Sequence, residues 1–285
     1  GQLGPRALAL IGTLAGQFHL SQGKIKTLLE QIMGLDFSLG AISQAHGQVA
    51  EVLEPICQEL HQGVQQASVK HADETTHQSH GHRMWLWAMV CDWGASFRID
   101  SSRGKTAAKQ LLGEPPSGIL VSDRYAGYTW VDLSQRQVCW AHLIRDFRRI
   151  ASRADLPGTL GRSLLGMGLL MFRYRDQSRP PTAYAPLRRR FTRVLERGTQ
   201  QHQCSRTANT CANLLKLEGA LWRFLEQPAV PPTNNLAERA LRGVVLRRKI
   251  SYVTRSGRGL RFVERTFAVA YTCRQQGKAL FDFLG

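Results

Sequence analysis

The 285-residue sequence contains no apolar run near the roughly 20 residues that a membrane-crossing helix needs, so we expect no membrane partner. Its six cysteines are scattered, and none of them forms a Cys-x-x-Cys pair or belongs to a four-ligand zinc pattern. This distribution argues against a disulfide framework and favours a reducing cytoplasm. No secretory signal or internal repeat is evident, and because the sequence begins Gly1-Gln2 without Met, a preceding segment is left open.

Acidic residues are scarce in the second half of the chain. Residues 1–140 carry 11 Lys and Arg against 12 Asp and Glu, a net charge of −1, whereas residues 141–285 carry 27 against 9, a net charge of +18. Arg dominates Lys in that half, and guanidinium groups suit bidentate phosphate contacts. The imbalance favours a polyanionic partner, whose phosphates release counterions when they are neutralised. A basic solubilising surface is the alternative interpretation.

The hydrophobic content of 43% allows a packed core, and the N-terminal region shows helical periodicity. Pro5 fits a first helical turn, Ser21 and Ser38 fit the N-caps of a second and a third helix, and Gly34 fits a helix end. Helices of this size joined by short turns resemble a helix-turn-helix DNA reader. A small helical bundle with no DNA role fits this nearly neutral region equally well.

A β-rich block follows the helices. Apolar and β-branched runs predict five strands, at residues 67–75, 84–90, 97–99, 118–121 and 137–140. A helix is predicted at residues 105–112. Three strands joined by short turns, followed by alternating strand and helix, favour a mixed sheet covered by helices. A group of three histidines lies on the expected hairpin loop, where we favour a role without metal: His77, His80 and His82.

Beyond Trp140 the strand signal disappears. Helices are predicted at residues 141–153, 159–175, 182–198 and 206–227, and from Asn235 to about Arg248. Prolines separate several of these segments. We then expect an extended stretch from Ile250 to Thr254, a turn at residues 257–259 and a final helix.

Three acidic residues stand out because of the elements that carry them. Asp73 and Asp123 each follow an apolar or β-prone run, and Glu238 lies just inside a predicted helix. Carboxylate oxygens suit Mg²⁺, and phosphoryl transfer of this kind uses two metal ions about 4 Å apart. Taken singly, the aspartates could be turn residues and Glu238 could complete a capping box. Taken together, on the first strand, the fourth strand and a helix, they indicate a two-metal site in a ribonuclease H-like arrangement.

Four motifs carry a family resemblance. They are Asp73-Glu-Thr75 followed by Trp85-Leu-Trp87, Ser122-Asp-Arg-Tyr-Ala-Gly-Tyr128, Cys139-Trp-Ala-His142-Leu-Ile-Arg145, and Asn234-Asn-Leu-Ala-Glu-Arg-Ala-Leu-Arg242. With these motifs in this order, the sequence from about Gly4 to Gly277 resembles the DDE transposase of the bacterial insertion-sequence sixty-six family.

The resemblance implies an α/β fold: a ribonuclease H-like mixed-sheet core with an α-helical insertion, preceded by an all-α, helix-turn-helix-like DNA-binding region. The implied division is 1–66 for the helix-turn-helix-like region, 67–154 for the first part of the catalytic core, 155–232 for the basic insertion and 233–285 for the completion of the core with the glutamate helix.

The resemblance also implies an activity and its ligands. Asp73, Asp123 and Glu238 would bind two Mg²⁺ ions, with Mn²⁺ as a substitute, and would serve in cleavage and strand transfer. The partners would be double-stranded DNA, both element ends and target, and further copies of the chain on that DNA in the bacterial cytoplasm, at the nucleoid. A ribonuclease H-like nuclease without joining activity and an inactive DNA-binding remnant are the alternatives, and the presence of all three acids argues against the remnant.

Other residues surround these motifs. Cys139 and His142 form a Cys-x-x-His pair, for which a structural or DNA-positioning role is favoured over zinc because two further ligands are not evident. Several cations near the motifs are candidates for DNA-backbone contact, with a solvated helix face as the alternative: Arg145, Arg239, Arg242, Arg247, Arg248 and Lys249. Arg239 and Arg242 are three residues apart and share a helix face.

Two departures from the family pattern stand out. Family members usually begin with a zinc-binding segment ahead of the helix-turn-helix-like region, and the given sequence does not include it. The position after the second aspartate is usually small, whereas here it is Arg124, which would alter the approach of a phosphate or metal.

Overall fold

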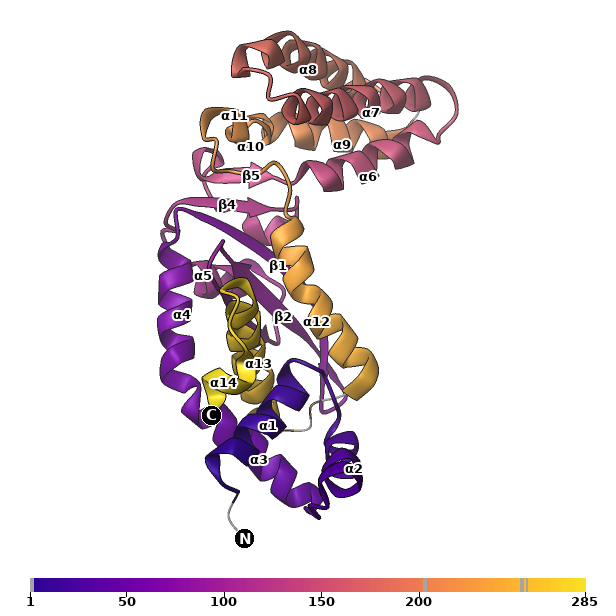
Figure 1. Cartoon of the computed structure of the whole chain (residues 1–285). Coiled ribbons are helices and arrows are strands. Elements are labelled where there is room, and N and C mark those ends of the chain that lie inside the picture. The colour runs from indigo at the N-terminus through magenta and orange to yellow at the C-terminus, as the bar shows by residue number, and fades with distance from the viewer. Residues whose placement is uncertain (1–2, 202–203, 252–253, 255) are drawn as a thin grey trace. The chain divides into compact units, whose positions relative to one another are not determined.

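A computed structural model of the chain describes residues 3–201, 204–251, 254 and 256–285 (Figure 1). The fold is mixed α/β, which confirms the predicted class, and its strands form one five-stranded sheet in the order β3-β2-β1-β4-β5. The chain divides into two compact units. Unit 1 comprises Gly1–Gly118, Ala126–Trp130 and Asn235–Gly285, and unit 2 comprises Ile119–Tyr125 and Val131–Asn234. None of the described helices is both long and apolar enough to span a bilayer.

Unit 1 begins with four helices: α1 (Pro5–Gly16), α2 (Gln22–Met33), α3 (Leu39–Val52) and α4 (Glu54–Gln66). The predicted caps are confirmed. The Ser21 hydroxyl accepts the backbone N–H of Lys24, and the Ser38 hydroxyl accepts that of Ala41. Gly34 ends α2 with a φ of 65°, a left-handed conformation that glycine adopts without a steric cost.

The N-terminal helices share a hydrophobic core with α13 (Gly257–Gln275). Ile11, Ile25 and Ile42 from α1, α2 and α3 are fully buried there, and they cluster with Phe262 and Val269 of α13. The short helix α14 (Leu280–Leu284) adds Leu280 to the same core. Residues near the two ends of the sequence therefore stabilise each other.

The sheet in unit 1 consists of three antiparallel strands, β1 (Val69–Ser79), β2 (His82–Val90) and β3 (Ala95–Asp100). All three predicted strands are confirmed, with ends that differ by a few residues. The register pairs Asp73 with Ala88 and Glu74 with Trp87. Because successive side chains of a strand point to opposite faces, Asp73 and Glu74 lie on opposite faces of the sheet.

One face of this sheet is covered by α12 (Asn235–Ser251) and α13. Leu86, Ala88 and Val90 of β2 pack there against Ala240 and Leu241 of α12. Since Ala88 is paired with Asp73, Asp73 belongs to the face that α12 covers. The glutamate helix and the first aspartate strand are thus on the same side of the sheet.

The opposite face carries a buried carboxylate that the sequence motifs contain but do not explain. The Glu74 side chain is 1% exposed. It accepts hydrogen bonds from Arg103 Nε and Nη2 at 2.9 and 2.7 Å and from the Tyr128 hydroxyl at 2.8 Å. The Arg103 guanidinium lies 4.6 Å above the Trp85 ring, and Tyr128 meets the Trp87 ring edge-on at 6.1 Å. Two residues from other parts of the sequence hold this carboxylate: Arg103, just before α5 (Lys105–Leu112), and Tyr128 of the 3₁₀ turn η1 (Ala126–Tyr128).

Unit 2 contains the parallel pair β4 (Ile119–Ser122) and β5 (Arg136–Val138), with a 3₁₀ turn, η2 (Leu133–Gln135), between them. Helices then follow to the end of the unit (Figure 1). They are α6 (Trp140–Ala151), α7 (Asp155–Asp176), the 3₁₀ turn η3 (Pro181–Tyr184), α8 (Ala185–Thr199), α9 (Ser205–Lys216), α10 (Glu218–Leu221) and α11 (Arg223–Glu226). Trp140 is fully buried as part of an aromatic cluster with Phe191 and Trp222. The prediction that strands give way to helices after Trp140 is confirmed.

The single helix predicted at residues 206–227 is wrong, because the chain breaks into α9, α10 and α11. A buried amide accounts for the break between α10 and α11. Gln137 accepts the N–H of Phe224 at 2.9 Å and donates to the carbonyl of Leu221 at 3.1 Å. The Trp140 indole also donates to the Leu221 carbonyl, at 2.7 Å. Side chains from elsewhere in unit 2 thus bind backbone groups that a continuous helix would use internally.

Two further expectations near the C-terminus are also wrong. Ile250 and Ser251 belong to α12 instead of an extended stretch, whereas Thr254 at the end of that stretch does form a β-bridge with Ser79. Tyr252 and Val253 lie outside the described residues. The glycines of the expected turn at residues 257–259 instead form the first turn of α13, because the Ser256 hydroxyl accepts the N–H of Gly259 at 3.1 Å and caps the helix.

Unit 1 also buries two histidines whose pKa values are low. Burial lowers the pKa of His46 to about 3 and that of His77 to about 4, and nearby arginines lower both further. The His77 ring is bonded to the Thr254 hydroxyl at 2.7 Å, whereas His80 and His82 are exposed. Both buried rings are therefore neutral in the folded chain near pH 7.

We expect a double-mutant cycle to detect the coupling between Glu74 and Tyr128. Glu74→Gln and Tyr128→Phe should each lower the free energy of unfolding, and their effects should be non-additive by about 0.5–3 kcal/mol because the two side chains share a hydrogen bond. Urea unfolding of the four proteins measures this coupling. The same cycle with Tyr271→Phe, on the other face of the sheet, should be additive, and additivity in the Tyr128 cycle would contradict the arrangement.

We also expect the free energy of unfolding to fall as the pH is lowered from 7 towards 4. Unfolded histidine binds a proton near pH 6.5 while folded His77 stays neutral to about pH 4, so the unfolded state takes up more protons in that window. Each such histidine lowers the free energy of unfolding by up to roughly 1.4 kcal/mol for each unit by which the pH falls within this window. Urea unfolding at pH 7 and pH 5 should show that the free energy of unfolding depends less on pH in His77→Gln than in the wild type, and equally in His80→Gln and the wild type. Equal pH dependence in all three proteins would disprove this cause.

Candidate catalytic site and DNA-binding residues

Asp73 occupies the middle of β1 and keeps part of its side chain exposed. Its Oδ1 accepts the backbone N–H of Glu74 at 2.9 Å, which orients the carboxylate along the strand. The neighbouring Glu74 is held on the opposite face by Arg103 and Tyr128. The Asp73 carboxylate thus lies on the side of the sheet that α12 covers, and the Glu74 carboxylate is held on the opposite side.

Glu238 lies in the first turn of α12 and is partly exposed. The buried stripe of this helix consists of Ala237, Ala240, Leu241 and Val244, so Glu238 is at the flank of the stripe that packs on the sheet. A carboxylate in a first helical turn is also stabilised by the positive end of the helix dipole. Asp73 and Glu238 are therefore placed by two elements of unit 1 that pack on each other.

Asp123 belongs to unit 2 and directly follows β4. Its Oδ1 accepts the N–H of Tyr125 at 2.9 Å, an Asx-type turn that shapes the loop after the strand. Its backbone carbonyl accepts from Arg136 Nη2 at 2.7 Å, and the Arg136 Nε donates to the Ser122 hydroxyl at 3.2 Å. Arg136 is 1% exposed, so a buried guanidinium from β5 fixes the end of β4.

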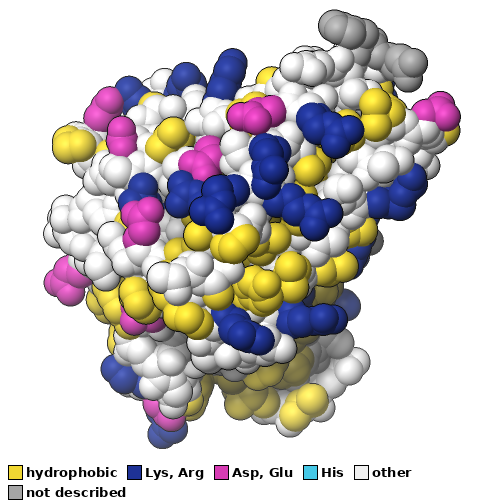
Figure 2. Space-filling model, turned by 90° about the horizontal axis from the view of Figure 1, so that it is seen from above, with side chains coloured by type: hydrophobic (Ala, Val, Ile, Leu, Met, Phe, Trp, Pro, Cys, Tyr) yellow, Lys and Arg dark blue, Asp and Glu magenta, His cyan; other side chains and the backbone are white. Residues whose placement is uncertain are grey.

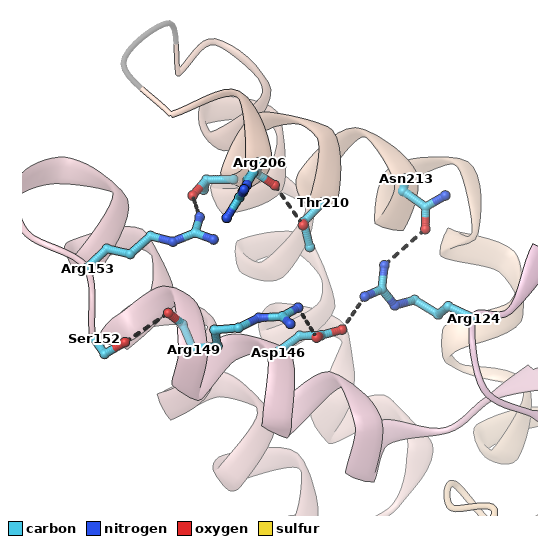
Figure 3. Close-up of polar contacts among 9 residues, drawn as sticks. Arg124, Asp146, Arg149, Ser152, Arg153, Arg206, Thr210 and Asn213 are labelled. Atoms are coloured by element: carbon cyan, nitrogen blue, oxygen red, sulfur yellow. Dashed lines mark hydrogen bonds and ion pairs between the residues drawn. The ribbon is translucent and has the colours of Figure 1, made fainter.

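Arg124, the departure from the family pattern, is engaged by other residues of unit 2 (Figure 3). Its guanidinium forms an ion pair with Asp146 of α6 and donates to Asn213 of α9 at 3.1 Å. Asp146 also pairs with Arg149 at 2.7 Å. The long side chain thus links the loop after β4 to two helices.

Cys139 and His142 also lie in unit 2, at the start of α6. Cys139 is buried, and its Sγ accepts the backbone N–H of Asn234 at 3.1 Å. Its own N–H donates to the Ser122 carbonyl at 2.8 Å. One potential ligand atom of each residue lies within 4.8 Å of the other. Through these two bonds, Cys139 connects the backbone of Asn234, the residue before α12, to the end of β4.

The predicted DNA-binding cations of α12 fall into two classes. Arg239 and Arg242 are exposed, and among the described residues neither forms an ion pair with a carboxylate. Arg247 instead donates to the carbonyl of Ala15 at 3.2 Å, and Arg248 donates to that of Thr76 at 2.7 Å. Two other predicted cations are exposed: Lys249 and, in unit 2, Arg145.

Unit 2 carries much of the positive charge, with 18 Lys and Arg against 8 Asp and Glu, a net charge of +10. Helix α8 contributes a row of exposed arginines: Arg189, Arg190, Arg193 and Arg197. Figure 2 shows a face of the molecule on which Lys and Arg recur among apolar and a few acidic side chains. Such a surface suits a polyanionic partner.

The three predicted metal ligands have chemistry that fits divalent cations. Each is a carboxylate with a partly exposed side chain, and hard oxygen donors are what Mg²⁺ and Mn²⁺ prefer. Asp73 and Glu238 are positioned by unit 1, and Asp123 by unit 2. The sequence motifs identified these three acids. They did not identify Glu74, Arg103 and Arg136, which appear in the sequence only as charged residues within or beside predicted strands.

Comparisons with known proteins bear on this arrangement. The sequence matches the family model described as Transposase IS66 family over residues 1–261. It is 26% identical over 289 residues to the uncharacterized protein y4qI of Sinorhizobium fredii (strain NBRC 101917 / NGR234), which covers 88% of this chain and 53% of that protein. It is 30% identical over 186 residues to the uncharacterized protein y4jO of the same strain, which covers 61% of this chain and 53% of that protein.

The chain spans about half the length of these curated relatives. The family match, in contrast, extends over most of the chain, from the N-terminal helices through β1, β4 and the glutamate helix into α13. On that match, the chain belongs to the IS66 family of transposases.

Proposed function

We propose that this chain is a DNA transposase that carries out metal-dependent cleavage and strand transfer at the ends of a bacterial insertion sequence. Asp73, Asp123 and Glu238 serve as its metal-binding triad, in a core of the ribonuclease H-like type. The observation that carries the proposal is the placement of Asp73 on the sheet face covered by α12, the helix whose first turn contains Glu238. Membership of the transposase family supports it.

The proposed reaction consists of two substitutions at phosphorus. In the first, a water oxygen attacks the phosphodiester at the element end, the bond from phosphorus to the 3′ oxygen breaks, and a free 3′-hydroxyl is left. In the second, that hydroxyl attacks a phosphodiester of target DNA and displaces its 3′ oxygen, which joins element to target. Two bound Mg²⁺ or Mn²⁺ ions would activate the attacking oxygen and stabilise the leaving one. The carboxylates form no covalent intermediate.

Cations outside the triad would hold the DNA. Arg239 and Arg242 follow Glu238 on α12 and are exposed, so we assign them to phosphate contacts beside the triad. Helices α2 and α3 are candidates for a helix-turn-helix-like reader of the element ends. Base readout and backbone contact are separate tasks, so these helices would supply specificity more than bulk affinity. Assembly of several copies on DNA at the nucleoid would follow from this function.

We expect Asp73→Asn, Asp123→Asn and Glu238→Gln each to lower strand transfer by about a thousandfold or more, because each removes a charged metal ligand worth several kcal/mol. The assay incubates the protein with Mg²⁺, pre-cleaved element-end DNA and plasmid, and joined products are quantified on gels. Asp92→Asn, at an exposed position in the turn after β2, is the matched control and should retain activity.

The same assay separates the alternatives. Nicked plasmid without joined products would favour a nuclease that does not join. A triad variant that stays folded and keeps full joining activity would overturn the assignment of that residue. Glu238→Gln also needs a stability measurement, because losing a negative charge in a first helical turn can cost up to about 1 kcal/mol.

We expect binding to duplex DNA to weaken steeply with salt and the double variant Arg239→Gln, Arg242→Gln to flatten the dependence. Each phosphate contact contributes about −0.9 to the slope of log affinity against log salt, so two lost contacts should change it by roughly two. Fluorescence anisotropy at several salt concentrations gives the slope. A double variant at exposed arginines of other elements, Arg6→Gln with Arg83→Gln, is the control, and an equal slope for both double variants would refute the α12 assignment.

A further inference from the structure

Unit 1 contains a cavity of about 470 Å³ that the proposed triad does not use. It lies among α2, α3, α12 and α13, and its lining combines apolar side chains with two arginines and several polar groups. The residues that matter here are Ser21, Gln22, Ser43, His46, Arg247 and Arg258. None of the described residues that line it is acidic. A cavity of this size suits a small ligand or one segment of a larger one.

Arg247 is a cation with no counter-ion among the residues that the structure describes. Desolvation lowers its pKa to about 10, although part of the residue stays exposed. Its one hydrogen bond within the described chain goes to the Ala15 carbonyl, and its guanidinium lies 5.8 Å above the Phe262 ring. No described carboxylate lies within ion-pair distance of it. A desolvated charge is costly unless an ion of the opposite sign accompanies it, so this guanidinium favours an anion in the cavity.

Arg258 brings a second guanidinium to the same space. Its Nη2 donates to the Ser43 hydroxyl at 3.3 Å, and its aliphatic part crosses Gly47 of α3. A Cβ at position 47 would come within 2.6 Å of the Arg258 Cδ. The missing side chain at Gly47 is therefore what lets Arg258 lie along α3.

His46 supplies an unused hydrogen-bond donor. The ring is 6% exposed and stacks on Phe262 with centroids 4.0 Å apart. The Gln22 amide nitrogen lies 3.3 Å from Nδ1, and with that nitrogen as donor the ring proton is on Nε2. Nε2 is buried without a hydrogen-bond partner among the described residues. Burial, together with the flanking arginines, lowers the pKa of His46 and keeps the ring neutral as an N–H donor.

Two helices begin at the cavity. The N-terminus of α2, with Ser21 and Gln22, and that of α13, with Ser256, both line it. Helix N-termini favour oxyanions because backbone N–H groups and the helix dipole point outward there. Two cations, two helix starts, hydroxyls and an unpartnered N–H together have the chemistry of a phosphate site.

We propose that this cavity binds a phosphoryl group, and that in the working protein this group is a phosphodiester of bound DNA. The phosphoryl chemistry follows from the residues of the cavity alone. The DNA source rests on the proposed function, while free inorganic phosphate would satisfy the same residues. Arg258 and Arg247 would neutralise the charge, and the Ser43 hydroxyl would donate a hydrogen bond.

The experiment uses the full chain with inorganic phosphate as the probe. Thermal unfolding is followed as phosphate replaces chloride at constant ionic strength, and the dissociation constant is obtained from the rise of the unfolding temperature. We expect stabilisation of the wild-type chain and a dissociation constant roughly tenfold to a hundredfold weaker in Arg258→Ala, which loses a charged hydrogen-bond donor.

Two further variants separate the site from general charge. Gly47→Ala keeps every charge but displaces Arg258, so it should weaken phosphate binding while the helix itself stays stable, because alanine favours helix more than glycine does. Arg261→Ala removes an exposed arginine one turn further along α13 and should bind phosphate like the wild type. Equal phosphate stabilisation in all four proteins, or none in the wild type, would overturn the site.

The DNA source is tested by competition. Duplex DNA at saturation should abolish the phosphate response of the wild type, and inorganic phosphate should weaken DNA binding by the wild type more than by Arg258→Ala. An undiminished phosphate response in the presence of DNA would overturn the DNA assignment and leave a site for free phosphate. Asp73→Asn should bind phosphate normally while losing strand transfer, so failure of the proposed activity and failure of this site give different results.

Discussion

The alternation of side chains along β1 is the constraint on which the candidate site depends. The pairing of Asp73 with Ala88 puts that aspartate on the face covered by α12, and the next residue, Glu74, then has to face the other way. A slip of one residue would exchange the two carboxylates between the faces. The bonds from Arg103 and Tyr128 to Glu74 oppose such a slip, because a displaced Glu74 would leave Arg103 without its buried partner. A structural carboxylate thus fixes the direction of the proposed metal ligand beside it.

The helices that cover the Asp73 face of the sheet are stabilised by residues from the start of the chain. Helix α13 packs on the sheet through Val263 and Phe267 and on the N-terminal helices through Phe262 and Val269. Because one helix serves both cores, the first 66 residues and the C-terminal helices are energetically coupled. If α2 and α3 read an element end, their attachment to α13 connects that readout to the body that carries α12. Removing residues 1–66 would expose the Phe262 face of α13, so point variants on α2 and α3 test end recognition more cleanly than a deletion.

Sequence patterns predicted the elements well wherever the determining interaction is local. The Ser21 and Ser38 caps and the helix at residues 105–112 agree with the structure, since a cap or a periodic stripe is read within a few residues. The failures involve partners far apart in the sequence. Gln137 breaks the helix predicted at residues 206–227 from about 85 residues away, and nothing near that segment signals it. In the same way the motif Asp73-Glu-Thr75 indicates the catalytic candidate, but the role of Glu74 depends on Arg103 and Tyr128, which periodicity cannot pair with it.

The arginines of α12 show why net charge alone does not locate a DNA contact. Four arginines lie along this helix, and the helical period turns them in different directions. Arg239 and Arg242 face away from the buried stripe, whereas Arg248 lies over the sheet and donates to the Thr76 carbonyl, and Arg247 reaches Ala15 in α1. A guanidinium that satisfies a backbone carbonyl stabilises the protein without adding a phosphate contact at that bond. Arg248 therefore holds α12 on the sheet and should not contribute to the salt dependence of DNA binding. The arginines expected to contribute are Arg239 and Arg242 and, through the proposed phosphate site, Arg247.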